Sequence, residues 1–206
     1  MISASEALQR LREGNRRFVN EQGIRAALAG RSKLKGHIES QAPFAIILGC
    51  SDSRVPAEII FDQGMGDLFV IRVAGNIVAP SQVGSVEFAA ERFGTRLVVV
   101  LGHSHCGAID ATLEALRAPQ MQQSPNIRSI VDRIRPPIEA LMATDLRLDT
   151  AALTRYAVRA NIRVSASHLR HGSRSLEELI EKQGLLVVGA EYSLETGVVD
   201  FFDHVP

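Results

Sequence analysis

Four short runs of almost uninterrupted apolar residues stand out along the chain, each bounded by polar or glycine-containing segments. They lie at residues 44–49, 68–73, 96–101 and 185–190. Strands that are apolar without alternation are typical of a parallel sheet covered on both faces. The four runs therefore predict four buried parallel strands.

Segments with helical periodicity separate these runs. Ser3 and Glu6 form a capping box ahead of apolar residues spaced three and four apart, which predicts a helix over residues 3–20. Glycine and proline mark the expected ends and breaks of the later helices. These helices are expected at residues 81–93, at 108–117, at 126–142 with a restart at Pro136-Pro137, at 150–171 with a stop at Gly172, and after an N-cap at Ser175.

The alternation of strands and helices predicts the fold class. It favours an α/β fold with a central, mostly parallel sheet flanked by helices and joined by right-handed crossovers. Residues 198–202 form a last apolar run after a turn, which we expect to pair as an antiparallel edge strand. The N-terminal helix has no obvious docking site within this layer, so we expect it to extend to a partner subunit.

Length and composition fit one globular domain. The chain has 206 residues, which we divide into an N-terminal helical arm, 1–42, and an α/β core, 43–206. Within the arm, residues 21–42 are polar and are expected to form a loop with a short helix.

Charge and hydropathy exclude several function classes. Lys and Arg total 23, as do Asp and Glu, so the chain lacks the basic excess of a nucleic-acid-binding protein. No apolar run approaches the roughly 18 residues that span a bilayer, and the N-terminus lacks the pattern of a secretory signal. We therefore expect a cytoplasmic protein with no nucleic-acid or membrane partner.

The two cysteines hold the candidate chemistry. Cys50 follows the first predicted strand directly, in Cys50-Ser51-Asp52-Ser53-Arg54, and Cys106 follows the third in the run Gly102-His103-Ser104-His105-Cys106-Gly107. The carboxyl ends of parallel strands meet at one edge of a sheet, so both thiols are expected there. Two thiolates and one imidazole suit Zn²⁺, and three protein ligands leave a fourth position open, as in a catalytic site.

Other interpretations of these residues are weaker. Free cysteines are often small buried hydrophobes, and a disulfide is poorly supported in a reducing compartment. His105 competes with His103 as the ligand, but a residue adjacent to Cys106 must turn its side chain back sharply to share the metal. His168 and His171 are better explained as solvated residues at a helix C-terminus. The GxxxxG spacing of residues 102–107 lacks the Lys-Ser/Thr of a phosphate loop.

Together the two motifs resemble those of the β-class carbonic anhydrases. The resemblance rests on CSDSR, on the GHSxCG element and on the run Phe69-Val70-Ile71-Arg72-Val73-Ala74-Gly75-Asn76, and it extends over nearly the whole chain. It implies reversible hydration of CO₂ to bicarbonate and a proton by zinc-bound hydroxide. Relatives of the fold hydrolyse carbon disulfide or carbonyl sulfide with the same ligands, and this alternative stays open.

The resemblance also assigns residues. It implies one Zn²⁺ per subunit on Cys50, His103 and Cys106, a catalytic dyad of Asp52 and Arg54, and Asp52 as a fourth ligand only in a closed state. The residues matching the family's substrate cleft are Gln41, Phe69, Ala74, Phe88 and Gly107. It further implies a homo-oligomer, a homodimer or a multiple of dimers such as a homotetramer, with active sites at the subunit interface, so Phe69 and Phe88 are expected to face a neighbour's zinc.

Overall fold

A five-stranded sheet organises the chain. The computed structural model describes residues 2–22, 41–118, 120 and 123–205, so the expected loop and short helix of residues 21–42 lie largely outside it. The strands have the order β2-β1-β3-β4-β5. The first four are parallel and β5 is antiparallel to β4, and both of these pairings were predicted. Their bounds are Ala45–Gly49 for β1, Leu68–Arg72 for β2, Leu97–His103 for β3, Leu186–Tyr192 for β4 and Val199–Asp203 for β5.

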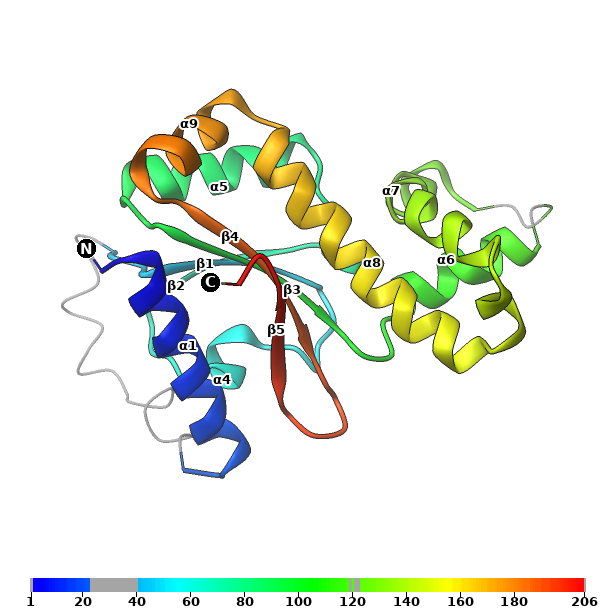
Figure 1. The fold of residues 1–206 in the computed structure, drawn as a ribbon, viewed down its shortest axis with the longest axis horizontal. Helices are drawn as coiled ribbons and strands as arrows, with labels where there is room; N and C mark the ends of the chain where they lie inside the picture. Colours follow the sequence, from blue (N-terminus) through cyan, green and yellow to red (C-terminus); the bar gives the residue numbers. More distant parts are fainter. Residues whose placement is uncertain (1, 23–40, 119, 121–122, 206) are drawn as a thin grey trace.

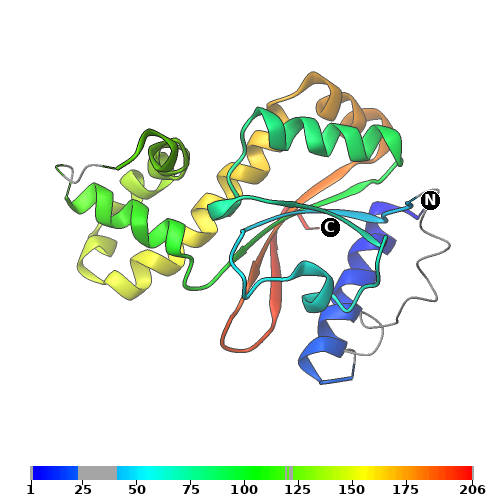
Figure 2. The same cartoon turned by 180° about the vertical axis from the view of Figure 1, so that it is seen from behind.

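Helices cover both faces of this sheet (Figures 1 and 2). One face carries α5, α8 and α9, the other carries α1 and α4, and α6 and α7 pack beside the N-terminal half of α8. The helix bounds are Ala4–Val19 for α1, Ala57–Ile60 for α4, Pro80–Arg92 for α5, Gly107–Arg117 for α6, Pro125–Met142 for α7, Thr150–His171 for α8 and Arg174–Gln183 for α9, with short 3₁₀ turns η2 at Ala74–Asn76 and η3 at Asp145–Leu148. No helix among these residues is long and apolar enough to cross a membrane.

Two apolar clusters, one on each face of the sheet, explain why the strand sequences are continuous apolar runs. Along β3, Val98 and Val100 pack with α5 and α8, while Val99 and Leu101 pack with α1 and α4. Every residue of β1 and β3 is buried. Alternating residues therefore serve opposite cores, which is why neither strand needs a polar position.

The N-terminal helix packs on its own sheet. Leu8 and Leu11 are buried in the same cluster as Phe61, and the Asn15 side chain donates to the carbonyl oxygens of Ile60 and Gly197. The capping box at the start of the helix is confirmed. We expected this helix to extend to a partner subunit because it had no obvious docking site on its own sheet, and that reason is wrong. Contact with a partner subunit stays a prediction.

Two helix boundaries differ from those expected. Pro136 and Pro137 do not restart α7, which runs through both. The carbonyl groups that lose their donors belong to Asp132 and Arg133, both exposed, so water replaces the lost bonds. The helix before β4 has Ser173 as its N-cap, and the Ser175 hydroxyl bonds Glu91 instead.

Candidate metal centre

Three buried side chains converge at the carboxyl edge of the sheet. Cys50 follows β1, His103 is the last residue of β3, and Cys106 is the N-cap of α6. The strands β1 and β3 are neighbours, with Gly49 paired to Leu101, so the two motifs emerge side by side. One ligand atom from each of the three side chains lies within 4.8 Å of the other two.

The surroundings of these atoms fit a metal ion. His103 is fully buried, and its Nδ1 lies 2.8 Å from the Ser104 carbonyl oxygen, while its Nε2 has no hydrogen-bond partner among the residues that the structure describes. A buried ring nitrogen without a partner is costly unless an ion takes that place. With two thiols as the other donors, this set suits Zn²⁺.

The two cysteines are free and buried, and they act as a pair. A hydrogen bond from the Cys106 thiol lowers the pKa of Cys50. Burial opposes this shift, whereas His103 and the Gly75 N–H, which lies 3.3 Å from Cys50 Sγ, add to it. The same bond raises the pKa of Cys106, because a second thiolate would repel the first. A cation binding both sulfurs therefore displaces the remaining proton.

Asp52 and Arg54 form a bidentate pair at the rim of the centre. Arg54 donates from Nε to Asp52 Oδ1 at 2.9 Å and from Nη2 to Oδ2 at 2.7 Å. These bonds hold the pKa of Asp52 well below its usual range, so the carboxylate stays charged. Its Oδ2 lies 3.8 Å from His103 Nε2, beside the three candidate ligands.

Arg72 is a residue that sequence reasoning did not assign. It ends β2 in register with Gly49, and it donates to the carbonyl oxygens of Cys50 at 3.0 Å and Asp52 at 2.5 Å. It thereby fixes the backbone of the CSDSR turn. An arginine at the carboxyl end of an apolar strand was the signal available in the sequence.

The expected cleft residues divide into two groups. Ala74 precedes Gly75, whose N–H contacts Cys50, and Gly107 starts α6 directly after Cys106. Gln41 precedes β1, at the opposite edge of the sheet from Cys50. Phe69 also lies toward that opposite edge, in register with Ile46.

Phe88 joins this second group. Its ring centroid lies 6.3 Å from that of Phe69 and 5.6 Å from that of Phe93, and its side chain is among the exposed apolar ones. Within one chain, therefore, Ala74 and Gly107 border the centre, while Gln41, Phe69 and Phe88 do not.

Glu195, in the loop between β4 and β5, is a second residue that sequence reasoning missed. Its carboxylate accepts hydrogen bonds from Ser104 Oγ at 2.8 Å, Ser193 Oγ at 2.9 Å and His105 Nε2 at 2.6 Å. These donors lower the pKa of Glu195 to about 2, with Ser104 the largest contributor. No pattern in the sequence links a loop near residue 195 to the motif at 102–107.

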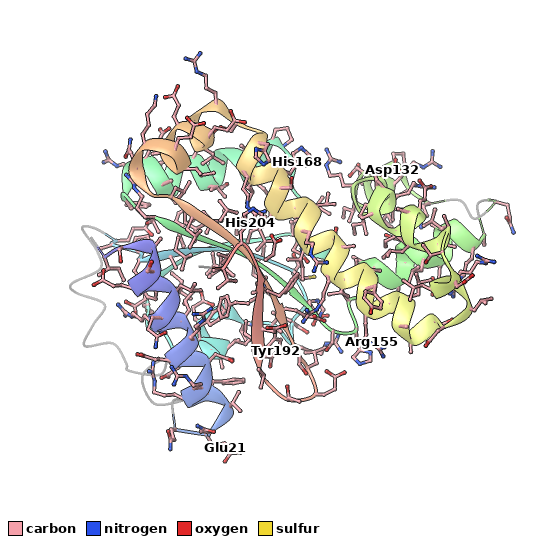
Figure 3. All side chains as sticks on the ribbon, in the orientation of Figure 1. Glu21, Asp132, Arg155, His168, Tyr192 and His204 are labelled. Atoms are coloured by element: carbon pink, nitrogen blue, oxygen red, sulfur yellow. The ribbon has the colours of Figure 1, made fainter. Side chains whose placement is uncertain are left out.

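Glu195 and its three hydrogen-bond partners line a cleft of about 770 Å³ between α8 and the hairpin of β4 and β5. Arg155 on α8, labelled in Figure 3, lines one side of this cleft, and Glu191 and Ser193, the neighbours of the labelled Tyr192, line the other. His105 faces this cleft, and among the described residues it is not part of the metal-ligating group. His168 and His171 are exposed and also stand outside that group, as expected of solvated residues.

Comparisons with known proteins agree with this geometry. A sequence profile described as carbonic anhydrase matches residues 45–199. The chain is 35% identical over 201 residues to carbonic anhydrase 2 of Mycobacterium tuberculosis, covering 97% of this chain and 93% of that protein. It is also 35% identical over 200 residues to a carbonic anhydrase of Mycolicibacterium smegmatis, again with 97% and 93% coverage.

Solved structures show the same fold. The β-carbonic anhydrase CcaA superposes with a TM-score of 0.76 at 26% identity, covering 95% of this chain and 98% of that one. A tetrameric β-carbonic anhydrase of the ascomycete Sordaria macrospora gives a TM-score of 0.73 at 22% identity, covering 96% and 97%.

Proposed function

Because the chain belongs to the β-class carbonic anhydrase family and is an enzyme of that class, we propose that it hydrates CO₂ reversibly on one zinc ion per subunit. Cys50, His103 and Cys106 hold the ion. The observation that carries this proposal is the convergence of three ligand atoms within 4.8 Å, one of them an imidazole Nε2 without a hydrogen-bond partner in the described part of the chain. When bound, zinc supplies a Lewis acid that makes water nucleophilic near neutral pH.

Asp52 orients the nucleophile. Its Oδ2 faces the ligand group at 3.8 Å from His103 Nε2, where it accepts the hydrogen of the attacking hydroxyl and directs an oxygen lone pair toward CO₂. Arg54 keeps the carboxylate ionised and fixes its plane through two hydrogen bonds. Asp52 would serve as a fourth ligand only after both bonds had broken, in the closed state that the family resemblance implies.

Residues beside the candidate ligands stabilise the bicarbonate as it forms and leave room for CO₂. Gly107 is the first residue of α6, an 11-residue helix, and its N–H has no partner within the helix. A donor at a helix N-terminus stabilises negative charge on a substrate oxygen. Ala74 borders the same space through its neighbour Gly75, so a small side chain there leaves room for CO₂.

The remaining cleft residues come from a partner subunit. Gln41, Phe69 and Phe88 lie toward the opposite edge of the sheet from Cys50, so they serve a zinc centre only across an interface between two copies of this chain. We therefore expect a homodimer or a multiple of dimers. The exposed Phe88 ring and the half-buried Phe69 ring beside it are then buried in the dimer, against CO₂ or bicarbonate at the neighbour's centre.

Zinc content and CO₂ hydration, measured on matched variants, test the function. His103→Ala removes the only ring nitrogen of the ligand group, whereas His171→Ala removes an exposed histidine at the end of α8. We expect His103→Ala to lose zinc and almost all activity, and His171→Ala to keep both. Metal-free wild type that still hydrates CO₂ would overturn the proposal, and sulfide release from carbonyl sulfide without CO₂ hydration would redirect it.

A further inference from the structure

The segment between two of the candidate ligands follows a strained path. His103 and Cys106 are separated by only two residues, yet their side chains converge, so the chain must reverse direction between them. His105 makes this turn with a φ of +53°. A left-handed conformation at a residue other than glycine is unfavourable and persists where the surroundings impose it.

The loop between β4 and β5 supplies those surroundings. The Ser104 N–H donates to the Tyr192 carbonyl oxygen at 3.0 Å, and the Leu194 N–H donates to Ser104 Oγ at 2.9 Å. Glu195 then accepts from both residues between the ligands, from Ser104 Oγ and from His105 Nε2. A carboxylate is only an acceptor here, so Nε2 carries the hydrogen.

These contacts reach the metal centre through two routes. His103 Nδ1 lies 2.8 Å from the Ser104 carbonyl oxygen, the contact that sets the tautomer and ring orientation of a ligating histidine. On the other side, Arg54 Nη2 donates to the His105 carbonyl oxygen at 3.2 Å. Glu195 is thus one residue removed from the candidate ligand His103 and from the dyad of Asp52 and Arg54.

We propose that Glu195 is a positioning residue of the zinc centre, which holds the His103–Cys106 segment in its ligating conformation through Ser104 and His105. The inference rests on the proposed function, because it concerns the geometry of the same site. Glu195 and His105 have side chains 55% and 68% exposed, so each bond contributes little to global stability. Loss of Glu195 should instead disturb the arrangement of the ligands, because hydrogen-bond partners of metal ligands change metal affinity by about tenfold or more.

The test compares Glu195→Ala with Asp200→Asn. Asp200 lines the same cleft and is also 55% exposed, but it pairs with Arg159 and does not touch the ligand segment. We expect Glu195→Ala to raise the zinc dissociation constant about tenfold in chelator competition and to change the visible absorption bands of the Co²⁺-substituted protein. Glu195→Gln, which keeps an acceptor for Ser104, should recover part of the affinity.

A measurement on the metal-free protein separates positioning from folding. In hydrogen exchange, amides of residues 103–106 should exchange faster in Glu195→Ala while those of β1 keep their protection. Unchanged affinity, absorption bands and exchange in Glu195→Ala would overturn the inference, as would an equal loss of affinity in Asp200→Asn. If wild type itself binds neither zinc nor Co²⁺, the proposed function fails instead, which keeps the two failures distinct.

Discussion

Arg54 serves two parts of the candidate site at once. Its guanidinium makes two bonds to the Asp52 carboxylate and a third to the carbonyl oxygen of His105, so the CSDSR turn and the ligand segment after β3 are joined through one side chain. Arg72 holds the other side of the turn through the carbonyl oxygens of Cys50 and Asp52. Two arginines therefore fix the position of a single carboxylate.

Asp52→Asn tests the role given to that carboxylate. Asparagine keeps the size and one oxygen acceptor but removes the charge that orients the nucleophile, so we expect kcat/KM for CO₂ hydration to fall about a hundredfold with zinc content unchanged. Stopped-flow assays with metal analysis measure both. The control is Ser53→Ala, an exposed neighbour in the same turn, and activity of Asp52→Asn within twofold of wild type would contradict the role.

At the scale of elements, α8 is fastened to the sheet by close packing and by a buried ion pair. A Cβ at Gly102 would lie 2.5 Å from Ile162 Cδ1 and 2.6 Å from its Cγ1, so glycine lets this side chain of α8 pack on β3 without shifting. Further along α8, Arg170 donates to the Val187 carbonyl oxygen on β4 and to Asp203 Oδ2 on β5 at 2.7 Å. These contacts were not foreseeable, because they join residues distant in sequence.

The ion pair of Arg170 and Asp203 should make stability depend on pH. Both side chains are largely buried, and although burial opposes ionisation, the Arg170 bond lowers the pKa of Asp203 below 3.8 on balance. A lowered native pKa means that the stabilisation is present above the unfolded pKa and is lost as pH falls below it. Asp203→Asn should therefore lower the free energy of unfolding by about 2 kcal/mol at pH 7.

That difference should shrink as the pH falls from 5 toward 3. Urea unfolding of the metal-free protein over this range measures it, and Asp145→Asn, at a residue 97% exposed, provides the control with no effect. A difference between Asp203→Asn and wild type that stays constant with pH would show that the carboxylate charge contributes nothing.

At the scale of the whole molecule, the expected substrate-binding residues lie at the two opposite ends of the parallel strands. Ala74 and Gly107 lie beside the candidate metal centre, and Phe69 and Phe88 lie toward the other end of the strands. In the proposed dimer, each of these two groups belongs to a different active site. Two copies of the chain would complete both sites, which would link activity to assembly.

Phe88→Arg should separate the subunits and lower activity together. The side chain is 53% exposed in a single chain, and a charge there opposes burial in an interface. Sedimentation equilibrium should show a smaller species, with CO₂ hydration reduced at least tenfold at low protein concentration. Ile127→Arg, on α7 and 52% exposed, is the matched control. A Phe88→Arg protein that keeps both wild-type mass and activity would contradict an active site shared between subunits.

The sequence by itself determined the sheet and the residues of the candidate metal centre. Continuous apolar runs specify strands buried on both faces, and a parallel sheet brings their carboxyl ends to one edge, so Cys50, His103 and Cys106 were predictable from strand ends and spacing. Hydrophobic period and local turn residues encode these features within a few positions.

Only the tertiary structure decided what holds the site in place. Arg72 acts from a neighbouring strand and Glu195 from a loop 91 residues beyond Ser104, to which it is bonded, and neither contact leaves a local pattern. The docking of α1 on its own sheet was likewise decided by the fit of Leu8 and Leu11 against Phe61. Such contacts depend on side-chain shape and distance after folding, which periodicity along the chain does not encode.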